Sequence, residues 1–163
     1  MRTPICKDCG WNDKLCLSCS KKLTDGQISP LDVEVARILY KINETQNISS
    51  AEFTKAYEIE NVVIIESPNP GLLIGKRGKV ISLISLALQK KVRIIRHGGD
   101  IKSKIADFVS PLKLLGLNTA WSEGREIIKI RLEKSNTPLY IQEQTLTKIL
   151  KEWLKKDVQI YYE

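Results

Sequence analysis

The chain has 163 residues, of which 42% are hydrophobic and 28% are charged, so it can bury a core and is unlike a disordered protein. No apolar run approaches the roughly 18 residues of a membrane-spanning helix, and the first residues form no apolar secretion segment. These features exclude a membrane-embedded class and predict a cytoplasmic protein of one large domain or two to three small ones.

All four cysteines lie near the N-terminus, at Cys6, Cys9, Cys16 and Cys19. Two residues separate the members of each pair, so a tight turn aims both sulfurs at one point, and two pairs supply the four thiolates of a tetrahedral site. Gly10 is expected to give this turn a positive φ. The spacing favours one structural zinc ion over two disulfides or an iron–sulfur cluster, because disulfides suit an oxidising compartment.

Residues 1–27 carry few apolar side chains besides the cysteines, so zinc binding is expected to drive their folding. Residues 28–98 and 99–163 are predicted to form two further units, each with its own core. Removal of the metal is therefore expected to unfold only residues 1–27.

A helix is predicted to begin after Ser29, with Pro30 at its first position and Asp32 near its positive end. One face of this helix is apolar, at Val35, Ile38, Leu39 and Ile42. Two β-like runs follow, 52–58 and 61–66, and a strongly apolar helical stretch covers 79–91 before a β-branched run at 92–96.

The sequence Gly75-Lys76-Arg77-Gly78 lies between two helical segments, where two glycines let a phosphate come close to the backbone. The N-terminus of the following helix favours an anion, and the two cations add charged hydrogen bonds. A plain surface turn is the alternative. We predict that RNA is contacted by Ile74, Gly75, Lys76, Arg77, Gly78, Lys79, Arg93 and Arg96.

Charge supports this placement. Residues 61–100 hold 7 Lys+Arg and 2 Asp+Glu, whereas residues 1–60 hold 8 and 9. A basic segment attracts polyanions by releasing their condensed counterions.

The second half repeats the pattern. Asp100 can cap a helix that ends at Ser110-Pro111, two β-like runs cover 117–122 and 125–133, and a helix at 143–156 precedes a strand at 158–162. Both halves are therefore predicted to be α-β-β-α-α-β. The stretch equivalent to the glycine loop, 141–144, has no glycine, so it is expected to extend the surface or to serve packing.

A helix–loop–helix with a G-x-x-G loop resembles a KH domain of type II, in which a helix and a strand precede the β-α-α-β core. Two such units resemble the RNA-binding half of the transcription factor NusA and its short archaeal relatives. The resemblance implies an α+β fold made of a zinc module and two KH folds. It also implies binding of single-stranded RNA and a role in transcription elongation or termination, with RNA polymerase as a partner.

Two further expectations concern function. The sequence offers neither a nucleophile with a base nor an open metal position, so we predict that the protein is not an enzyme. The alternative to an RNA-binding regulator is an adaptor that docks through its zinc module on the ribosome or an RNA-processing complex, with RNA contact secondary.

Overall fold

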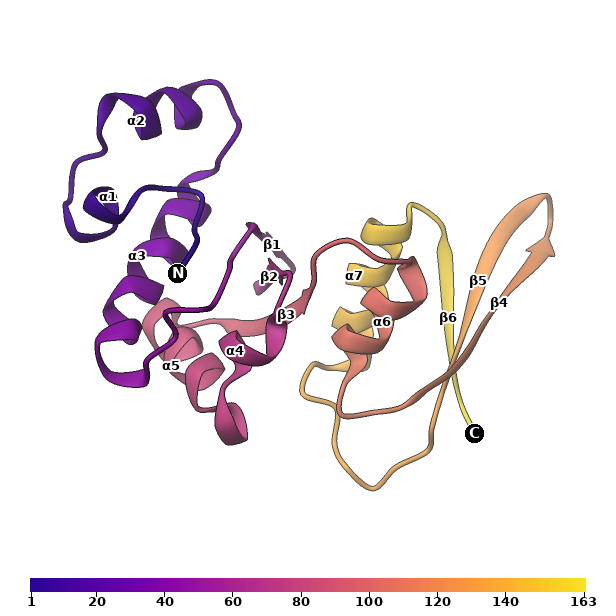
Figure 1. The fold of residues 1–163 in the computed structure, drawn as a ribbon. Coiled ribbons are helices and arrows are strands. Elements are labelled where there is room, and N and C mark those ends of the chain that lie inside the picture. The colour runs from indigo at the N-terminus through magenta and orange to yellow at the C-terminus, as the bar shows by residue number, and fades with distance from the viewer. The chain divides into compact units, whose positions relative to one another are not determined.

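The computed structural model describes residues 1–163, which divide into two compact units, Met1–Gly98 and Gly99–Glu163. The predicted α+β class is confirmed, because each unit combines helices with a three-stranded sheet (Figure 1). None of the helices is both long enough and apolar enough to cross a membrane.

The first unit begins with two short helices, α1 (Lys7–Trp11) and α2 (Leu17–Thr24), each of which follows one cysteine and contains another. The elements that follow are α3 (Pro30–Gln46), β1 (Lys55–Ile59), β2 (Val62–Ser67), α4 (Pro70–Ile74), the 3₁₀ turn η1 (Lys76–Gly78), α5 (Lys79–Leu88) and β3 (Lys91–Arg96). The order from α3 onward is the predicted α-β-β-α-α-β.

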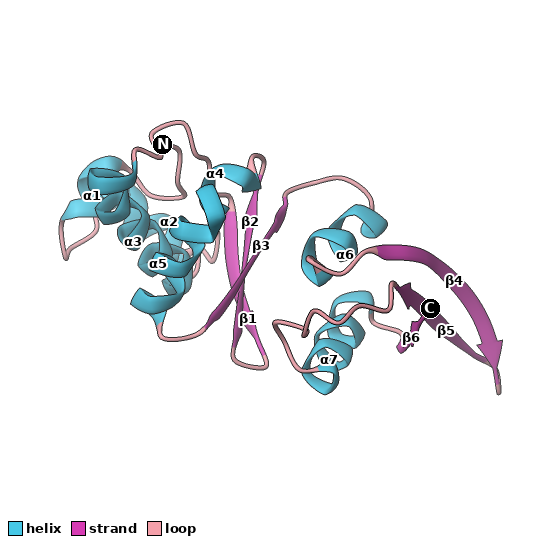
Figure 2. Ribbon diagram, turned by 90° about the horizontal axis from the view of Figure 1, so that it is seen from below, coloured by secondary structure: helices cyan, strands magenta, loops and turns pink.

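The sheet of the first unit has the order β1-β2-β3, with β1 antiparallel and β3 parallel to β2. A parallel pair needs a crossover connection, and α4, η1 and α5 provide it. Figure 2 shows α3, α4 and α5 on one side of this sheet. Residues of that side form one core with the helices, including Val63, Ile65, Val92 and Ile94.

The start of α3 is fixed by a capping box, as the sequence around Ser29 suggests. The hydroxyl of Ser29 accepts from the N–H of Asp32 (3.1 Å), and the Asp32 carboxylate accepts from the N–H of Ser29 (2.8 Å). The second oxygen of Asp32 accepts from the N–H of Ala56 in β1 (2.7 Å). One buried carboxylate therefore holds both the helix cap and the first strand.

The cysteine segment does not have a core of its own. Ile5, Cys9 and Cys19 are buried in the same cluster as Val35, Ala36 and Leu39 of α3. The expectation that loss of metal would unfold only residues 1–27 therefore needs revision, because that loss would open a core shared with α3.

Gly10 shows how closely the two parts pack. A Cβ added at Gly10 would lie 2.0 Å from Cδ2 of Tyr40 in α3, so only glycine fits there. Its φ is not positive, contrary to the expectation from sequence. Gly10 is required for close contact with α3 rather than for a left-handed turn.

The second unit contains α6 (Ile101–Val109), β4 (Leu114–Ser122), β5 (Arg125–Leu132), α7 (Glu143–Leu154) and β6 (Asp157–Tyr162). Its sheet repeats the first one, with β4 antiparallel and β6 parallel to β5. The predicted cap at Asp100 is present, since its carboxylate accepts from the N–H of Ser103 (3.0 Å).

The predicted order of the second unit is wrong at one point. It has α-β-β-α-β, because residues 133–142 form neither helix nor strand and no counterpart of α4 exists. Pro138 lies in this stretch, where it removes an N–H donor and biases Thr137 away from helical geometry. The stretch 141–144 is therefore not a loop between two helices.

Candidate nucleic-acid interface and metal centre

The glycine loop connects α4 to α5 through three residues with positive φ. These are Gly75 (φ 77), Arg77 (φ 55) and Gly78 (φ 71). Such angles are rare for residues with a Cβ, so Arg77 holds a strained backbone conformation at the tip of the loop. The loop therefore reverses the chain sharply and ends directly at the first residue of α5.

The two glycines of the loop differ in the space available to an added Cβ atom. A Cβ at Gly75 would lie 2.5 Å from Cγ2 and 2.9 Å from the backbone nitrogen of Val80, whereas a Cβ at Gly78 would meet nothing closer than 3.7 Å. Val80 is buried in the core, so it cannot move aside easily. Gly75 is thus required for both space and angle, and Gly78 for angle alone.

The loop presents cations to solvent. Lys76, Arg77 and Lys79 are all exposed, and they lie within four consecutive positions. The N–H of Gly78 donates to the carbonyl of Gly75 (3.1 Å), which closes the turn. A polyanion passing this loop would meet three cations and the positive end of a ten-residue helix.

The short helix α4 adds an apolar edge. Ile74, which was predicted, is 38% exposed, and Leu72, which was not, is 41% exposed. The signal for Leu72 was present in the sequence, because a five-residue helix can bury only one of its sides, and Leu73 occupies that side. An apolar edge beside the cations suits the faces of unpaired bases.

The two predicted arginines of β3 lie on opposite faces of the sheet. Val92 and Ile94 face the helices in the core, so the alternation of a strand puts Arg93 on the opposite face of the sheet. Arg96 is exposed at the end of β3, and strand alternation puts it on the same face of the sheet as Ile94. The structure therefore brings residues 74–79 together and separates Arg93 from them.

The four cysteines converge on one point. Cys6 immediately precedes α1 and Cys9 lies within it, whereas Cys16 caps α2 and Cys19 lies in its first turn. Their sulfur atoms all lie within 4.8 Å of one another. Four sulfurs at about 2.3 Å from a zinc ion would be about 3.8 Å apart, so this group can hold one metal ion.

Backbone donors already point at the sulfurs. The N–H of Cys16 donates to Cys9 Sγ (3.0 Å), and the N–H groups of Cys6 and Cys19 donate to Cys19 Sγ and Cys16 Sγ (both 3.4 Å). Such donors stabilise thiolates. The hydrogen bond from Cys19 lowers the pKa of Cys16 to about 7, whereas burial raises the pKa of Cys9 to about 12. A metal ion would favour the charged form of all four.

Arg37 of α3 holds the cysteine segment from outside the cluster. Its Nε donates to the carbonyl of Cys9 (3.2 Å), and its Nη2 donates to the carbonyl of Asp13 (2.9 Å). The side chain therefore fixes the turn that follows the first cysteine pair. This anchor was not predicted, since twenty-eight positions separate Arg37 from Cys9.

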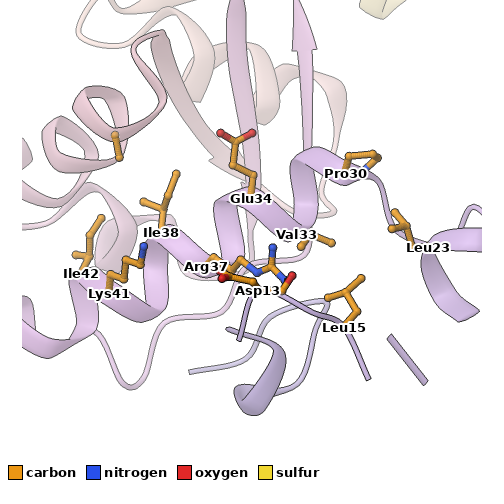
Figure 3. Close-up of a pocket in the computed structure, with 11 residues that line it drawn as sticks. Asp13, Leu15, Leu23, Pro30, Val33, Glu34, Arg37, Ile38, Lys41 and Ile42 are labelled. Atoms are coloured by element: carbon orange, nitrogen blue, oxygen red, sulfur yellow. The ribbon is translucent and has the colours of Figure 1, made fainter. Parts of the chain in front are cut away.

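A hollow of about 660 Å³ lies between the cysteine segment and α3 (Figure 3). Its apolar lining comes from both parts, with Leu15 and Leu23 on one side and Ile38 on the other. Glu34 and Lys41 are exposed and contribute opposite charges to its lining. The hollow exists only because the cysteine segment packs on α3.

Comparisons with known proteins agree with this geometry. A family model described as "KH domain" matches residues 31–111, from α3 through the glycine loop and past α6. A solved structure titled "Crystal structure of APE1850", of an archaeal protein, covers 77% of this chain and 96% of its own, with a TM-score of 0.50 and 16% identity. That likeness concerns the fold alone. No curated protein matches the chain.

The matched residues include the helix–loop–helix in which Gly75 and Gly78 flank two exposed cations, and KH domains use this loop to clamp the backbone of nucleic acid. The region 31–111 is therefore a KH domain, a module of RNA-binding proteins.

Proposed function

We propose that the protein is a non-enzymatic, cytoplasmic regulator of transcription that is similar to NusA and binds single-stranded RNA on its first unit. The single observation that carries this proposal is the loop 75–78, in which Gly75 leaves no room for a side chain and Lys76 and Arg77 are exposed. RNA polymerase is the expected large partner. The role in elongation or termination follows from the resemblance to NusA.

Unpaired RNA fits this site better than a duplex. The apolar edge of Leu72 and Ile74 lies next to the loop, so bases can face it while the phosphates meet Lys76 and Arg77. The edges of paired bases would be turned away from such a surface. Competition between matched single-stranded and duplex RNA is therefore expected to favour the single strand.

The main experiment removes the charge of the loop without touching the core. Lys76→Asp with Arg77→Asp is expected to weaken RNA binding about 100-fold, because it replaces attraction with repulsion. The log–log salt slope should fall by about 1.4, from two lost phosphate contacts on a single strand. Filter binding or anisotropy at several salt concentrations measures both.

The matched control lies in the second unit, where Gln142→Asp with Gln144→Asp introduces the same acidic pair in the stretch without glycines. It is expected to leave affinity close to wild type. Equal losses from the two variants, or no loss from the first, would place the RNA site elsewhere. Unchanged thermal unfolding of each variant excludes a folding defect as the cause.

The four cysteines are proposed to hold one structural zinc ion. Four thiolates fill a tetrahedral site and leave no position for a substrate, so the ion would supply folding energy rather than catalysis. Elemental analysis of protein purified without added metal is expected to find about one equivalent of zinc. Iron in place of zinc would indicate a cluster instead.

A second candidate function is favoured by the hollow between the cysteine segment and α3. An adaptor could insert apolar side chains of a ribosomal, polymerase or processing-complex protein there, between the charges of Glu34 and Lys41. The exposed pair allows a test by Glu34→Lys with Lys41→Glu. If this hollow variant no longer co-purifies with a large complex but keeps its RNA affinity, the adaptor is favoured. If the loop variant loses RNA affinity and the hollow variant still co-purifies normally, the regulator is favoured.

A further inference from the structure

The sheet of the second unit has one face that its own helices leave uncovered. Figure 2 shows α6 and α7 on the same side of this sheet. Ile130, Leu132 and Val158 are buried on the helix side, so the residues that alternate with them point outward. We call this surface the outer face, and its polar members used below are Arg125, Lys129, Arg131, Gln159 and Tyr161.

An aromatic ring and two cations lie next to one another on the outer face. Tyr161 is the direct cross-strand partner of Arg131, and the ammonium of Lys129 lies 5.7 Å from the centre of the Tyr161 ring. The phenol donates to Oε1 of Gln159 (2.7 Å), which holds the ring in place. Tyr161 remains 42% exposed, so part of its flat ring is open to a ligand.

The guanidinium of Arg131 is placed by a glycine. A Cβ at Gly116 of β4 would lie 2.6 Å from Nη2 of Arg131, so the absence of that atom lets the side chain extend across the neighbouring strand. Its Nε is buried and has no hydrogen-bond partner. Nη1 lies 3.6 Å from the exposed Glu163 carboxylate, a long contact that contributes little. Arg131 is thus held on the outer face, and the exposed end of its guanidinium is only weakly paired.

We propose that the outer face is a second contact surface for single-stranded RNA, with a base stacked on Tyr161 and the adjacent phosphates bound by Lys129 and Arg131. Sheet-borne aromatics stack bases in other RNA-binding folds, and every base offers a face for stacking. Arg125 lies on the same face further along β5 and can extend the path of the backbone. An acidic peptide would use the cations but not the ring.

This inference rests on the proposed function, since it assumes that the chain binds RNA. It also changes the role of the second unit. Its lack of a glycine loop removes the KH clamp, and the outer face would supply contact by a different chemistry. The RNA would then engage both units, and its affinity would depend on substitutions in each.

The test uses the full chain and a single-stranded RNA of roughly twenty nucleotides, longer than the four that a KH loop clamps. Tyr161→Ala is expected to weaken binding about tenfold, whereas Tyr161→Phe keeps the ring and should bind nearly as wild type. Lys129→Ser with Arg131→Ser should also weaken binding and lower the salt slope by about 1.4. Lys102→Ser in α6 with Lys155→Asn at the end of α7 removes the same charge outside the outer face and should have little effect.

A measurement without substitutions guards against folding defects. Ultraviolet crosslinking of the wild-type complex, followed by mass spectrometry, is expected to place a nucleotide adduct on the peptide that contains Tyr161. Binding that is unchanged by the outer-face variants, with no adduct in β6, would overturn the proposal while leaving the loop variant to decide the proposed function. If polyglutamate displaces RNA from the outer face as well as unlabelled single-stranded RNA does, the face binds an acidic protein partner instead. That result would also overturn the proposal.

Discussion

The two units of the chain share one sheet design but differ in the segment between its second and third strands. In the first unit, β2 and β3 are joined by α4, the loop 75–78 and α5, whereas β5 and β6 are joined by an irregular stretch and α7 alone. Both sheets pair their strands antiparallel and then parallel. The sheet therefore tolerates either crossover.

The comparison separates what builds the fold from what forms the clamp. A long helix, α5 or α7, is enough to return the chain to a parallel strand and to cover the sheet. The short helix and the glycine loop contribute little burial, since only Leu73 of α4 is buried. They are additions that present cations, and the second unit folds without them.

Removal of the metal should produce the largest difference between the units. A chelator, or Cys9→Ser, is expected to destabilise the first unit by about 5 kcal/mol or more, because Cys9 and Cys19 belong to the core of α3. Hydrogen exchange should rise through α3 and β1–β3 and stay unchanged in residues 99–163. An increase in exchange confined to residues 1–27 would show that the shared core does not couple the cysteine segment to α3 and the sheet.

Alanine substitutions of Gly75 and Gly78 test the segment in which the two units differ. Gly75→Ala is expected to cost about 2–3 kcal/mol and to impair RNA binding, because its Cβ would collide with Val80 at a φ of 77°. Gly78→Ala adds strain without a collision and should cost about 1 kcal/mol. Denaturant unfolding and RNA titration of both variants measure these effects. Equal costs would mean that Val80 can move aside.

The helix caps provide a milder contrast. Asp32→Ala removes a capping hydrogen bond and leaves the buried N–H of Ala56 without an acceptor, so a loss of about 2–3 kcal/mol is expected. Asp100 caps α6 but holds no strand, so Asp100→Ala should cost clearly less. Thermal unfolding of the two variants tests the ranking. A larger loss at Asp100 would contradict the assigned role of Asp32.

Acid should produce the smallest of these effects, at the cap of α6 in the second unit. Hydrogen bonds from the side chain and backbone of Ser103 lower the pKa of Asp100 in the folded state. The stabilisation is therefore complete above the unfolded value near 3.9 and is lost as the pH falls through the folded value. The protection of amides in the first turn of α6, relative to their intrinsic exchange rates, should therefore fall below about pH 4. Asp100→Asn, the control, should abolish this change.

Several features were predictable because their causes are local. The spacing of Cys6, Cys9, Cys16 and Cys19 predicted a cluster that the structure assembles, and Ser29 and Asp100 predicted helix starts that are present. The loop 75–78 was identified from its glycines and its flanking apolar stretch. The caps, the loop and each cysteine pair depend on residues within about four positions of one another, where backbone geometry decides, and the two cysteine pairs lie only seven positions apart.

The sequence by itself determined the α+β class, the cluster of cysteines and the place of the glycine loop, since turn angles, caps and strand alternation are properties of short segments. Only the tertiary structure decided that the cysteine segment shares the core of α3, that Gly10 makes room for Tyr40, that Arg93 faces away from the helices and that the second unit lacks a counterpart of α4. These features depend on the packing of residues far apart in the chain, which no local pattern records.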